Sequence, residues 1–233
     1  MIRQNAPLPP LRALVLDAYG TLFNVHSVIT TCEALFPGKG SALSQLWRSK
    51  QLEYSWLRSL MGRYVDFNEV TREGLQYACA SLGLSYTEIV LAQLEKAYRT
   101  LDVFDDTLPT LKQLRRQQPD LKLAILSNGA AEMLNAVVTH NKLDAMLDVV
   151  ISVDEVGIFK PDPRVYQLAC DRLNLARDEI GFVSSNGWDA AGAAAFGFTT
   201  FWINRAHAPV EALGVTPDRV LNTLAALPAL LAR

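Results

Sequence analysis

Four short polar segments of this chain, each placed directly after an apolar run, contain the residue types that could carry out chemistry. They are Asp17–Thr21, Ser127–Gly129, Phe159–Pro163 and Ser184–Asp189. Taken singly, each has an ordinary explanation, because Asp, Ser, Asn and Gly are common in turns and helix caps, and a lone lysine is usually a solvated charge. Together, and each at a strand end, they predict one clustered site, since a buried sheet edge does not tolerate polar side chains without a purpose.

The apolar runs before these segments are short enough for β-strands, and several lack a polar face, as buried parallel strands do. The predicted strands are Leu11–Leu16, Leu121–Leu126, Val149–Ser152, Ile180–Val183 and Thr199–Ile203. The predicted helices between the later strands are Thr107–Gln118, Ala131–His140, Pro163–Leu173 and Ala190–Phe196. This alternation predicts an α/β fold with right-handed crossovers, that is, a Rossmann-like, doubly wound parallel sheet.

The segment between the first two predicted strands is the exception, because it contains no convincing strand. Amphipathic stretches predict three helices there, at Ser41–Met61, Asn68–Leu82 and Ser85–Leu101. The expected organisation is an all-helical cap of residues 24–102 inserted into a core of residues 1–23 plus 103–233. Such a cap should cover the carboxyl edge of the sheet, where open α/β sheets bind ligands. The Ala- and Leu-rich stretch Val220–Leu231 predicts a packing helix.

Composition narrows the class of partner. The chain has 22 basic and 24 acidic residues among 233 and a net charge of −2. This argues against nucleic acid, since phosphate contacts need clustered Lys and Arg. No apolar run approaches the roughly 20 residues that span a bilayer. Cys32, Cys79 and Cys170 are far apart, which predicts reduced thiols of a cytoplasmic protein and no metal site.

The order of the polar segments resembles that of the haloacid dehalogenase superfamily over essentially the whole chain. The shared pattern is Asp-x-x-x-Thr after strand one, Ser-Asn after strand two, Lys-Pro, and a final acidic loop. Most members are magnesium-dependent phosphatases, but two departures imply that the metal is lost here. Tyr19 stands where phosphatases have an acid Asp, and Ser184-Ser185 replaces the Gly-Asp pair that binds magnesium. Magnesium needs hard oxygen ligands, and here its direct carboxylate ligand is absent while the positively charged Lys160 remains nearby. We therefore expect neither a metal nor a cofactor.

Three longer motifs are similar to those of the L-2-haloacid dehalogenases. They are Leu46–Tyr54 in the cap, Lys160–Tyr166 and Ser184–Asp189, with Ser49 a mild departure from the Gln of some members. The resemblance implies a metal-independent hydrolase that converts short (S)-2-haloacids into (R)-2-hydroxy acids and halide. The partners that it implies are a small 2-haloalkanoate, a halide ion and a second copy of the chain in a homodimer.

The resemblance implies that Asp17 is the nucleophile. It would displace the halide with inversion and form an ester, whose acyl carbon is then attacked by water. A carboxylate is a weak nucleophile in water, so the cap must exclude water from the pocket around Asp17. Lys160, together with a hydrogen bond from Thr21, would keep Asp17 ionised there.

The second step needs a group that activates water, and Asp189 is the candidate. Asn186, Ser184 and Lys160 are expected to orient Asp189. Tyr166 is expected to form a hydrogen bond within the site and to position Lys160.

Two further sets of residues follow from the resemblance. The substrate carboxylate would be bound by Ser127 and by the backbone N–H groups of Ala18 and Tyr19, in the manner of anions at a helix start. The departing halide would be received by Arg48, Asn128 and the ring edge of Trp188, as an oxyanion hole receives developing charge.

An apolar pocket for the alkyl chain would be lined by Tyr19, Leu52, Phe67 and Trp188. Plain core packing explains Leu52 and Phe67 nearly as well. The bland alternative for Arg48 is a surface charge on an amphipathic helix.

Two alternatives stay open. The first is a phosphatase or phosphonatase of the same superfamily with a degenerate metal site, which would release phosphate with magnesium and no halide. The second is a non-catalytic relative that acts as a binding protein, although such a protein would be expected to have lost Asp17, Lys160 or Asp189.

Overall fold

The computed structural model describes residues 7–232, in which six parallel strands form one sheet of order β3-β2-β1-β4-β5-β6. The strands are β1 (Ala13–Leu16), β2 (Lys122–Ser127), β3 (Val149–Ser152), β4 (Ile180–Ser184), β5 (Thr199–Ile203) and β6 (Arg219–Leu221). This confirms the predicted α/β fold with a doubly wound parallel sheet. The strand order reverses between β1 and β4, and open α/β sheets bind their ligands at such a point.

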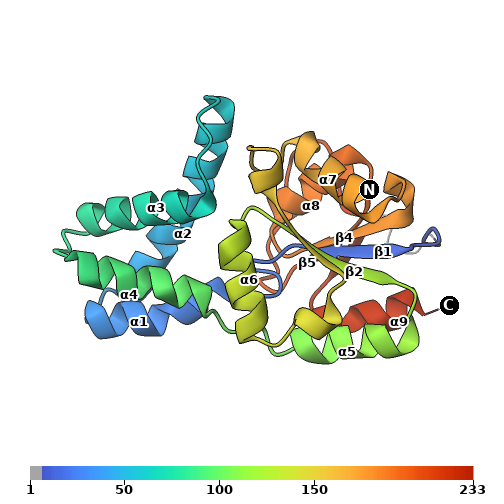
Figure 1. The fold of residues 1–233 in the computed structure, drawn as a ribbon, viewed down its shortest axis with the longest axis horizontal. Coiled ribbons are helices and arrows are strands. Elements are labelled where there is room, and N and C mark those ends of the chain that lie inside the picture. Colours follow the sequence, from blue (N-terminus) through green and yellow to red (C-terminus); the bar gives the residue numbers. More distant parts are fainter. Residues whose placement is uncertain (1–6, 233) are drawn as a thin grey trace.

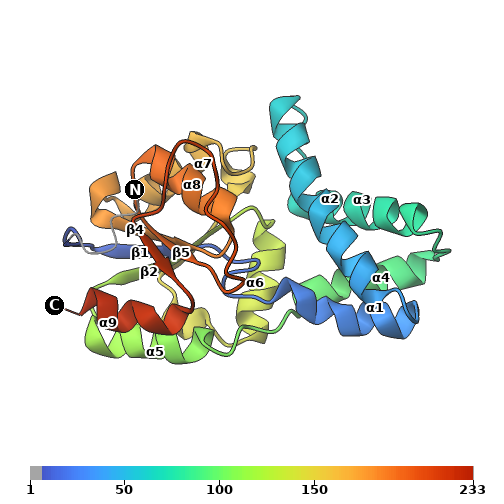
Figure 2. The same ribbon diagram turned by 180° about the vertical axis from the view of Figure 1, so that it is seen from behind.

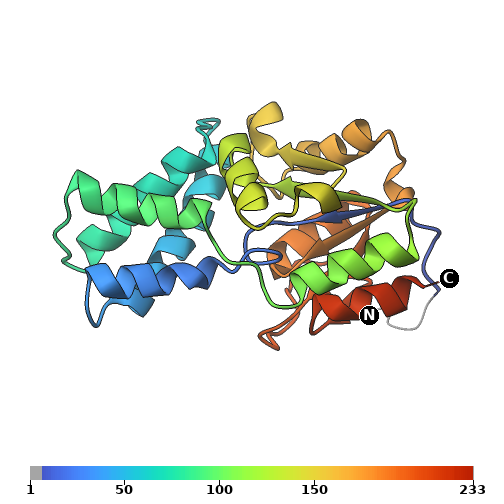
Figure 3. The ribbon, with the colours of Figure 1, turned by 60° about the horizontal axis from the view of Figure 1, so that its bottom comes forward.

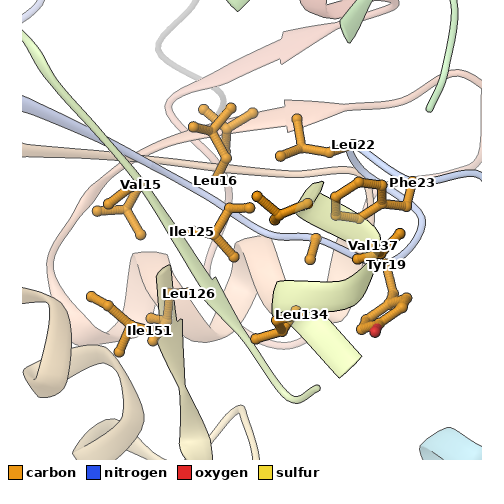
Figure 4. Close-up of a cluster of buried hydrophobic side chains, with 14 of the residues drawn as sticks. Val15, Leu16, Tyr19, Leu22, Phe23, Ile125, Leu126, Leu134, Val137 and Ile151 are labelled. Carbon is orange, nitrogen blue, oxygen red and sulfur yellow. The ribbon is translucent and has the colours of Figure 1, made fainter. Parts of the chain in front are cut away.

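Helices cover both faces of the sheet. The core helices are α5 (Thr107–Gln117), α6 (Ala131–His140), α7 (Pro163–Leu173), α8 (Gly187–Phe196) and α9 (Leu227–Leu231). Helices α5 and α9 lie side by side on one face, and α7 and α8 lie on the other (Figure 1, Figure 3). Leu134 of α6 belongs to the same apolar cluster as Leu16, Ile125 and Ile151 of the sheet (Figure 4). Because β1 is buried along its whole length, its apolar sequence has no polar face.

The helical segment between β1 and α5 stands beside the core (Figure 1, Figure 2). Its helices are α1 (Ile29–Leu35), α2 (Gly40–Leu60), α3 (Phe67–Ser81) and α4 (Glu88–Arg99), of which α1 was not predicted. The chain leaves and re-enters the core through adjacent segments, since Phe23 forms an antiparallel bridge with Val103. Within residues 7–232 no helix has the length and apolar character needed to cross a bilayer.

A buried polar network holds α2, α3 and α4 together. The indole N–H of Trp47 donates to the carbonyl of Thr71 at 2.7 Å, and the amide of Gln51 donates to the Thr71 hydroxyl at 2.9 Å. The Tyr98 hydroxyl donates to the Gln51 carbonyl oxygen at 3.0 Å. Pairing matters because a buried polar group left without a partner costs about 1–3 kcal/mol. The network therefore fixes the rotation of α2, and with it the direction of Arg48.

The prediction of one helix over Val220–Leu231 was wrong in its first part. Arg219–Leu221 is instead the edge strand β6, which pairs with β5. The Thr223 hydroxyl then accepts a hydrogen bond from the N–H of Ala225 and begins a short 3-10 turn. Pro228 lies in the first turn of α9, the place where a helix tolerates proline. The other predicted strands and helices are present with slightly shifted ends.

Candidate active site

Asp17 follows β1 directly, and four side chains donate hydrogen bonds to it. Its Oδ2 accepts from Asn186 Nδ2 at 2.8 Å, from Thr21 Oγ1 at 2.9 Å and from Ser184 Oγ at 3.3 Å. Its Oδ1 accepts from Lys160 Nζ at 3.1 Å. The residue is only 6% exposed. Three donors thus fix one oxygen, while the other has a single charged donor.

Lys160 joins this carboxylate to a second one. Its Nζ lies 2.8 Å from Oδ2 of Asp189, and both residues are buried. The Tyr166 hydroxyl donates to Oδ1 of Asp189 at 2.8 Å. The backbone N–H of Lys160 donates to Oδ1 of Asn128 at 2.8 Å, so the loop after β2 fixes the start of the Lys160 segment.

Burial and charge shift the pKa values of this cluster in distinct ways. Burial raises the pKa of Asp189 to about 6, against the opposing effect of Lys160 and with a contribution from the charge of Asp17. Burial disfavours the charge of Lys160, but the two carboxylates outweigh it and raise its pKa. Burial beside Asp189 raises the pKa of Tyr166 well above its usual value. Asp189 can therefore exchange a proton near neutral pH.

Two contacts differ from those expected. The side chains of Ser184 and Asn186 hydrogen-bond to the carboxylate of Asp17 and not to that of Asp189. The hydrogen bond expected of Tyr166 within the site is present and goes to Asp189, which in turn contacts Lys160. The reason is where α8 begins. Asn186 is its N-cap residue and makes no side-chain capping bond, so its amide is available to Asp17 at the end of the adjacent strand β1.

The residues assigned to the substrate carboxylate and the halide lie around the same edge. Ser127 ends β2, is buried, and accepts a hydrogen bond from the N–H of Gly129 at 3.1 Å. Within residues 7–232 the N–H groups of Ala18 and Tyr19 have no hydrogen-bond acceptor. Arg48 of α2 donates to the Tyr19 carbonyl at 3.4 Å. Helix α2 therefore reaches the loop that carries Asp17.

The aromatic residues of the predicted pocket come from both parts of the chain. Tyr19 stacks on Phe67 of α3, with ring centroids 6.0 Å apart. Leu52 lies one turn after Arg48 on α2 and is half-buried. Trp188 of α8 is half-buried, and its indole N–H has no acceptor among the described residues.

Sequence reasoning missed Trp56 and Arg205, and it gave Ser185 no role in the site. Trp56 packs edge to face on Trp188, with centroids 5.4 Å apart. It lies two turns after Arg48 on α2, so helical spacing alone could have placed it on the same face. Arg205 lies two residues after the end of β5 and donates to the Ser185 hydroxyl at 2.6 Å. The sequence feature that could have indicated Arg205 is its position as a charged residue just after a predicted strand, at the same sheet edge as the other site residues.

The donor set does not fit a magnesium ion. The ammonium group of Lys160 lies between Asp17 and Asp189, and the Ser185 hydroxyl is bound by a guanidinium. Among residues 7–232 there is no group of three or more His, Cys, Asp or Glu side chains that could hold a metal. A divalent cation would have to displace a buried lysine from both carboxylates.

This fold and this charged cluster define a class of protein. The model of the haloacid dehalogenase-like hydrolase family matches residues 11–197, and the chain belongs to that family. It is 47% identical, over 93% of this chain and 96% of the relative, to an (S)-2-haloacid dehalogenase of Pseudomonas putida. It is 48% identical to the (S)-2-haloacid dehalogenase of Pseudomonas sp. strain YL, over 93% of each chain. Within the class, the chain therefore belongs with the (S)-2-haloacid dehalogenases.

A solved structure supports the same grouping. The L-2-haloacid dehalogenase of Xanthobacter autotrophicus with chloropropionic acid covalently bound superposes with a TM-score of 0.89 at 42% identity. The match covers 95% of this chain and 98% of that one.

Replacing Lys160 by Met should raise the pKa of Asp189 further above about 6, because the ammonium now opposes its protonation. Carbon NMR of labelled aspartate carboxyl groups would follow the titration. Lys122→Met is the matched control, since Lys122 begins β2, at the end of the strand away from the site, and its ammonium donates to the Leu173 carbonyl at 3.2 Å. An unchanged or lowered pKa of Asp189 in Lys160→Met would contradict the proposed coupling.

Proposed function

We propose that this protein hydrolyses short (S)-2-haloacids to (R)-2-hydroxy acids and halide, through an ester on Asp17. The observation that carries the proposal is the buried ammonium of Lys160, which contacts Asp17 at 3.1 Å and Asp189 at 2.8 Å. One carboxylate can act as nucleophile and the other as base without a metal. The names of the similar dehalogenases, one with covalently bound chloropropionic acid, support the same reaction.

In the first step, an oxygen of Asp17 attacks the α-carbon of the haloacid from the side opposite the halogen. The carbon–oxygen bond forms as the carbon–halogen bond breaks, and the halide leaves with the electron pair. Oδ1 is the better candidate for attack, because three donors hold Oδ2 in place. Burial removes the water that would weaken a carboxylate nucleophile.

Ligand contacts for this step come from the residues that surround Asp17. The free N–H groups of Ala18 and Tyr19, with Ser127, would bind the substrate carboxylate. Arg48 and Asn128 would stabilise the leaving halide, since Asn128 uses only its Oδ1 for Lys160. Leu52, Phe67 and Trp188 would line an apolar pocket for the alkyl chain of the substrate.

In the second step, Asp189 takes a proton from a water molecule as the water oxygen adds to Cγ of Asp17. The bond between Cγ and the alkyl oxygen then breaks, and Asp189 returns its proton to that oxygen as the hydroxy acid leaves. The carboxyl group of Asp17 releases its own proton and is again a carboxylate. Lys160 and Tyr166 hold Asp189 in position. A pKa of about 6 suits a group that must accept a proton and release it again near neutral pH.

A single turnover in water labelled with heavy oxygen tests this chemistry. Excess enzyme, with (S)-2-chloropropionate and a chelator, should release chloride and carry the label on Asp17, with little label in the first product. Mass spectrometry of the enzyme and ion chromatography of chloride are the measurements. Asp17→Asn should abolish turnover with an unchanged circular dichroism spectrum.

Label that entered the hydroxy acid directly would contradict an Asp17 ester. Chloride release that required magnesium would contradict a metal-independent site. Magnesium-dependent phosphate release from an aryl phosphate without chloride release would favour the phosphatase alternative.

The rate of ester hydrolysis should fall as the pH is lowered through about 6, where Asp189 becomes protonated. The sign follows from its role, because only the ionised carboxylate accepts a proton from water, so the rate follows the ionised fraction. Rapid quenching and mass spectrometry of the alkylated enzyme on both sides of pH 6 would measure it. A hydrolysis rate that rose on acidification would remove Asp189 as the base.

We also propose that residues 24–102 act as one cap on a core of residues 1–23 plus 103–233, and that the protein is a cytoplasmic homodimer. Exposed apolar side chains on the outer side of α2 and α3 favour association there. Leu60 is 84% and Met61 61% exposed, and Tyr77 is 43% exposed. Large exposed apolar patches commonly mark protein interfaces.

Leu60→Asp should shift the protein from dimer to monomer in sedimentation, because a charge would be buried without a partner at the interface. Leu213→Asp is the control, since Leu213 is also exposed, at 60%, but lies in the loop before β6. Sedimentation of the unchanged chain as a monomer would reject the dimer.

A further inference from the structure

Arg205 touches three other segments at the edge of the sheet that carries the site. One arm of its guanidinium donates to the Ser185 hydroxyl at 2.6 Å. The other arm donates to the Thr21 carbonyl at 3.2 Å and to Oδ1 of Asp106 at 2.9 Å. The guanidinium carbon lies 4.0 Å from the centre of the Phe104 ring. One side chain thereby joins the ends of β1, β4 and β5 to the start of α5.

Asp106 anchors this guanidinium from the other side. Its Oδ2 accepts from the Thr223 hydroxyl at 2.6 Å and from the N–H of Leu224 at 2.8 Å. Burial opposes the ionisation of Asp106, but the hydrogen bonds from Thr223, Arg205 and Leu224 prevail and lower its pKa. The position of Arg205 is therefore fixed by a charged and fully hydrogen-bonded partner.

Ser185 and Thr21, the two partners of Arg205, are also partners of each other. The backbone N–H of Ser185 donates to Oγ1 of Thr21 at 2.8 Å, and Thr21 Oγ1 donates to Oδ2 of Asp17 at 2.9 Å. A hydroxyl that accepts on one side is left to donate on the other, so its proton is directed at Asp17.

We propose that Arg205 is a positioning residue for the nucleophile, acting through Ser185 and Thr21 on Oδ2 of Asp17. This inference rests on the proposed function of the site. None of the contacts of Arg205 among residues 7–232 is with a residue assigned to substrate binding. Its loss should therefore slow the attack of Asp17 without weakening the binding of the haloacid.

The contacts of this side chain require an arginine, and another cation such as lysine could not form all of them. The guanidinium of Arg205 reaches three acceptors with its two arms, whereas the single ammonium of lysine acts as a point charge. Arg205→Lys would keep a charge beside Asp106, yet it cannot hold Ser185 and Thr21 together.

Rapid-quench mass spectrometry of the Asp17 ester tests the proposal with (S)-2-chloropropionate. Arg205→Met should lower the rate of ester formation by roughly 10- to 100-fold, as small misplacements of reacting groups do, with KM unchanged. Ser185→Ala should lower the same rate, and the double variant should be no slower than the slower single variant, because both remove one chain of contacts. Arg205→Lys should recover thermal stability but not the rate.

Arg177→Met is the matched control. Arg177 also lies over a phenylalanine ring, 4.4 Å from the centre of Phe196, and also donates to a carbonyl, but it is remote from Asp17. It should retain the full rate of ester formation.

Several outcomes would overturn the role of Arg205. They are a lower melting temperature with an unchanged rate in Arg205→Met, additive losses in the double variant, a raised KM as the main effect, and full recovery by lysine. If Arg205→Met does not fold, an unchanged rate in Ser185→Ala overturns it as well. Absence of chloride release by the unchanged enzyme would instead reject the proposed function. The role of Arg205 would then be decided by whether a crystal structure of Arg205→Met keeps the bond between Thr21 and Asp17.

Discussion

The ammonium group of Lys160, held between the carboxylates of Asp17 and Asp189, is the interaction on which the rest of the site depends. Two carboxylates buried together without a cation would share one proton, and the pair would lose either its nucleophile or its base. The positive charge of Lys160 stabilises both negative charges, although it is itself a third buried charge. Because desolvation offsets the attraction, such a cluster is a weak source of stability. Removing its one cation would nevertheless cost roughly 3–5 kcal/mol, since a charge is then left unpaired.

The segments that follow neighbouring strands supply the side chains that hold this cluster. Reversal of the strand order places β1 beside β4, so Asn186 and Ser184 reach the carboxylate that ends β1. The loop after β2 contributes Asn128, which holds the backbone of Lys160. Because parallel strands end at one edge, residues distant in the sequence meet there without any cofactor to assemble them.

The sequence predicted the sheet well because its central strands are buried on both faces, which leaves a continuous apolar run. β6 escaped prediction because a short edge strand depends on pairing with β5, which no local pattern reveals. The order of the polar loops predicted which residues lie in the site, but it did not predict which of them hydrogen-bond to one another. Whether Asn186 or Asp189 faces Asp17 depends on where α8 begins, since each residue turns a helix by about 100°. Arg205 was missed because its three acceptors lie in three separate segments.

Helices α1–α4 and the rest of the chain contribute differently to the site. Among residues 7–232, every side chain that hydrogen-bonds to the carboxylate of Asp17 or Asp189 lies outside α1–α4, at 2.8–3.3 Å. Helix α2 contributes Arg48 through a longer hydrogen bond of 3.4 Å to the Tyr19 carbonyl, and Trp56 and Phe67 pack on Trp188 and Tyr19. Helix α2 itself is held by its buried polar network. Asp17 is only 6% exposed, and its four side-chain donors all lie outside α1–α4, so the charged cluster does not depend on these helices for its hydrogen bonds.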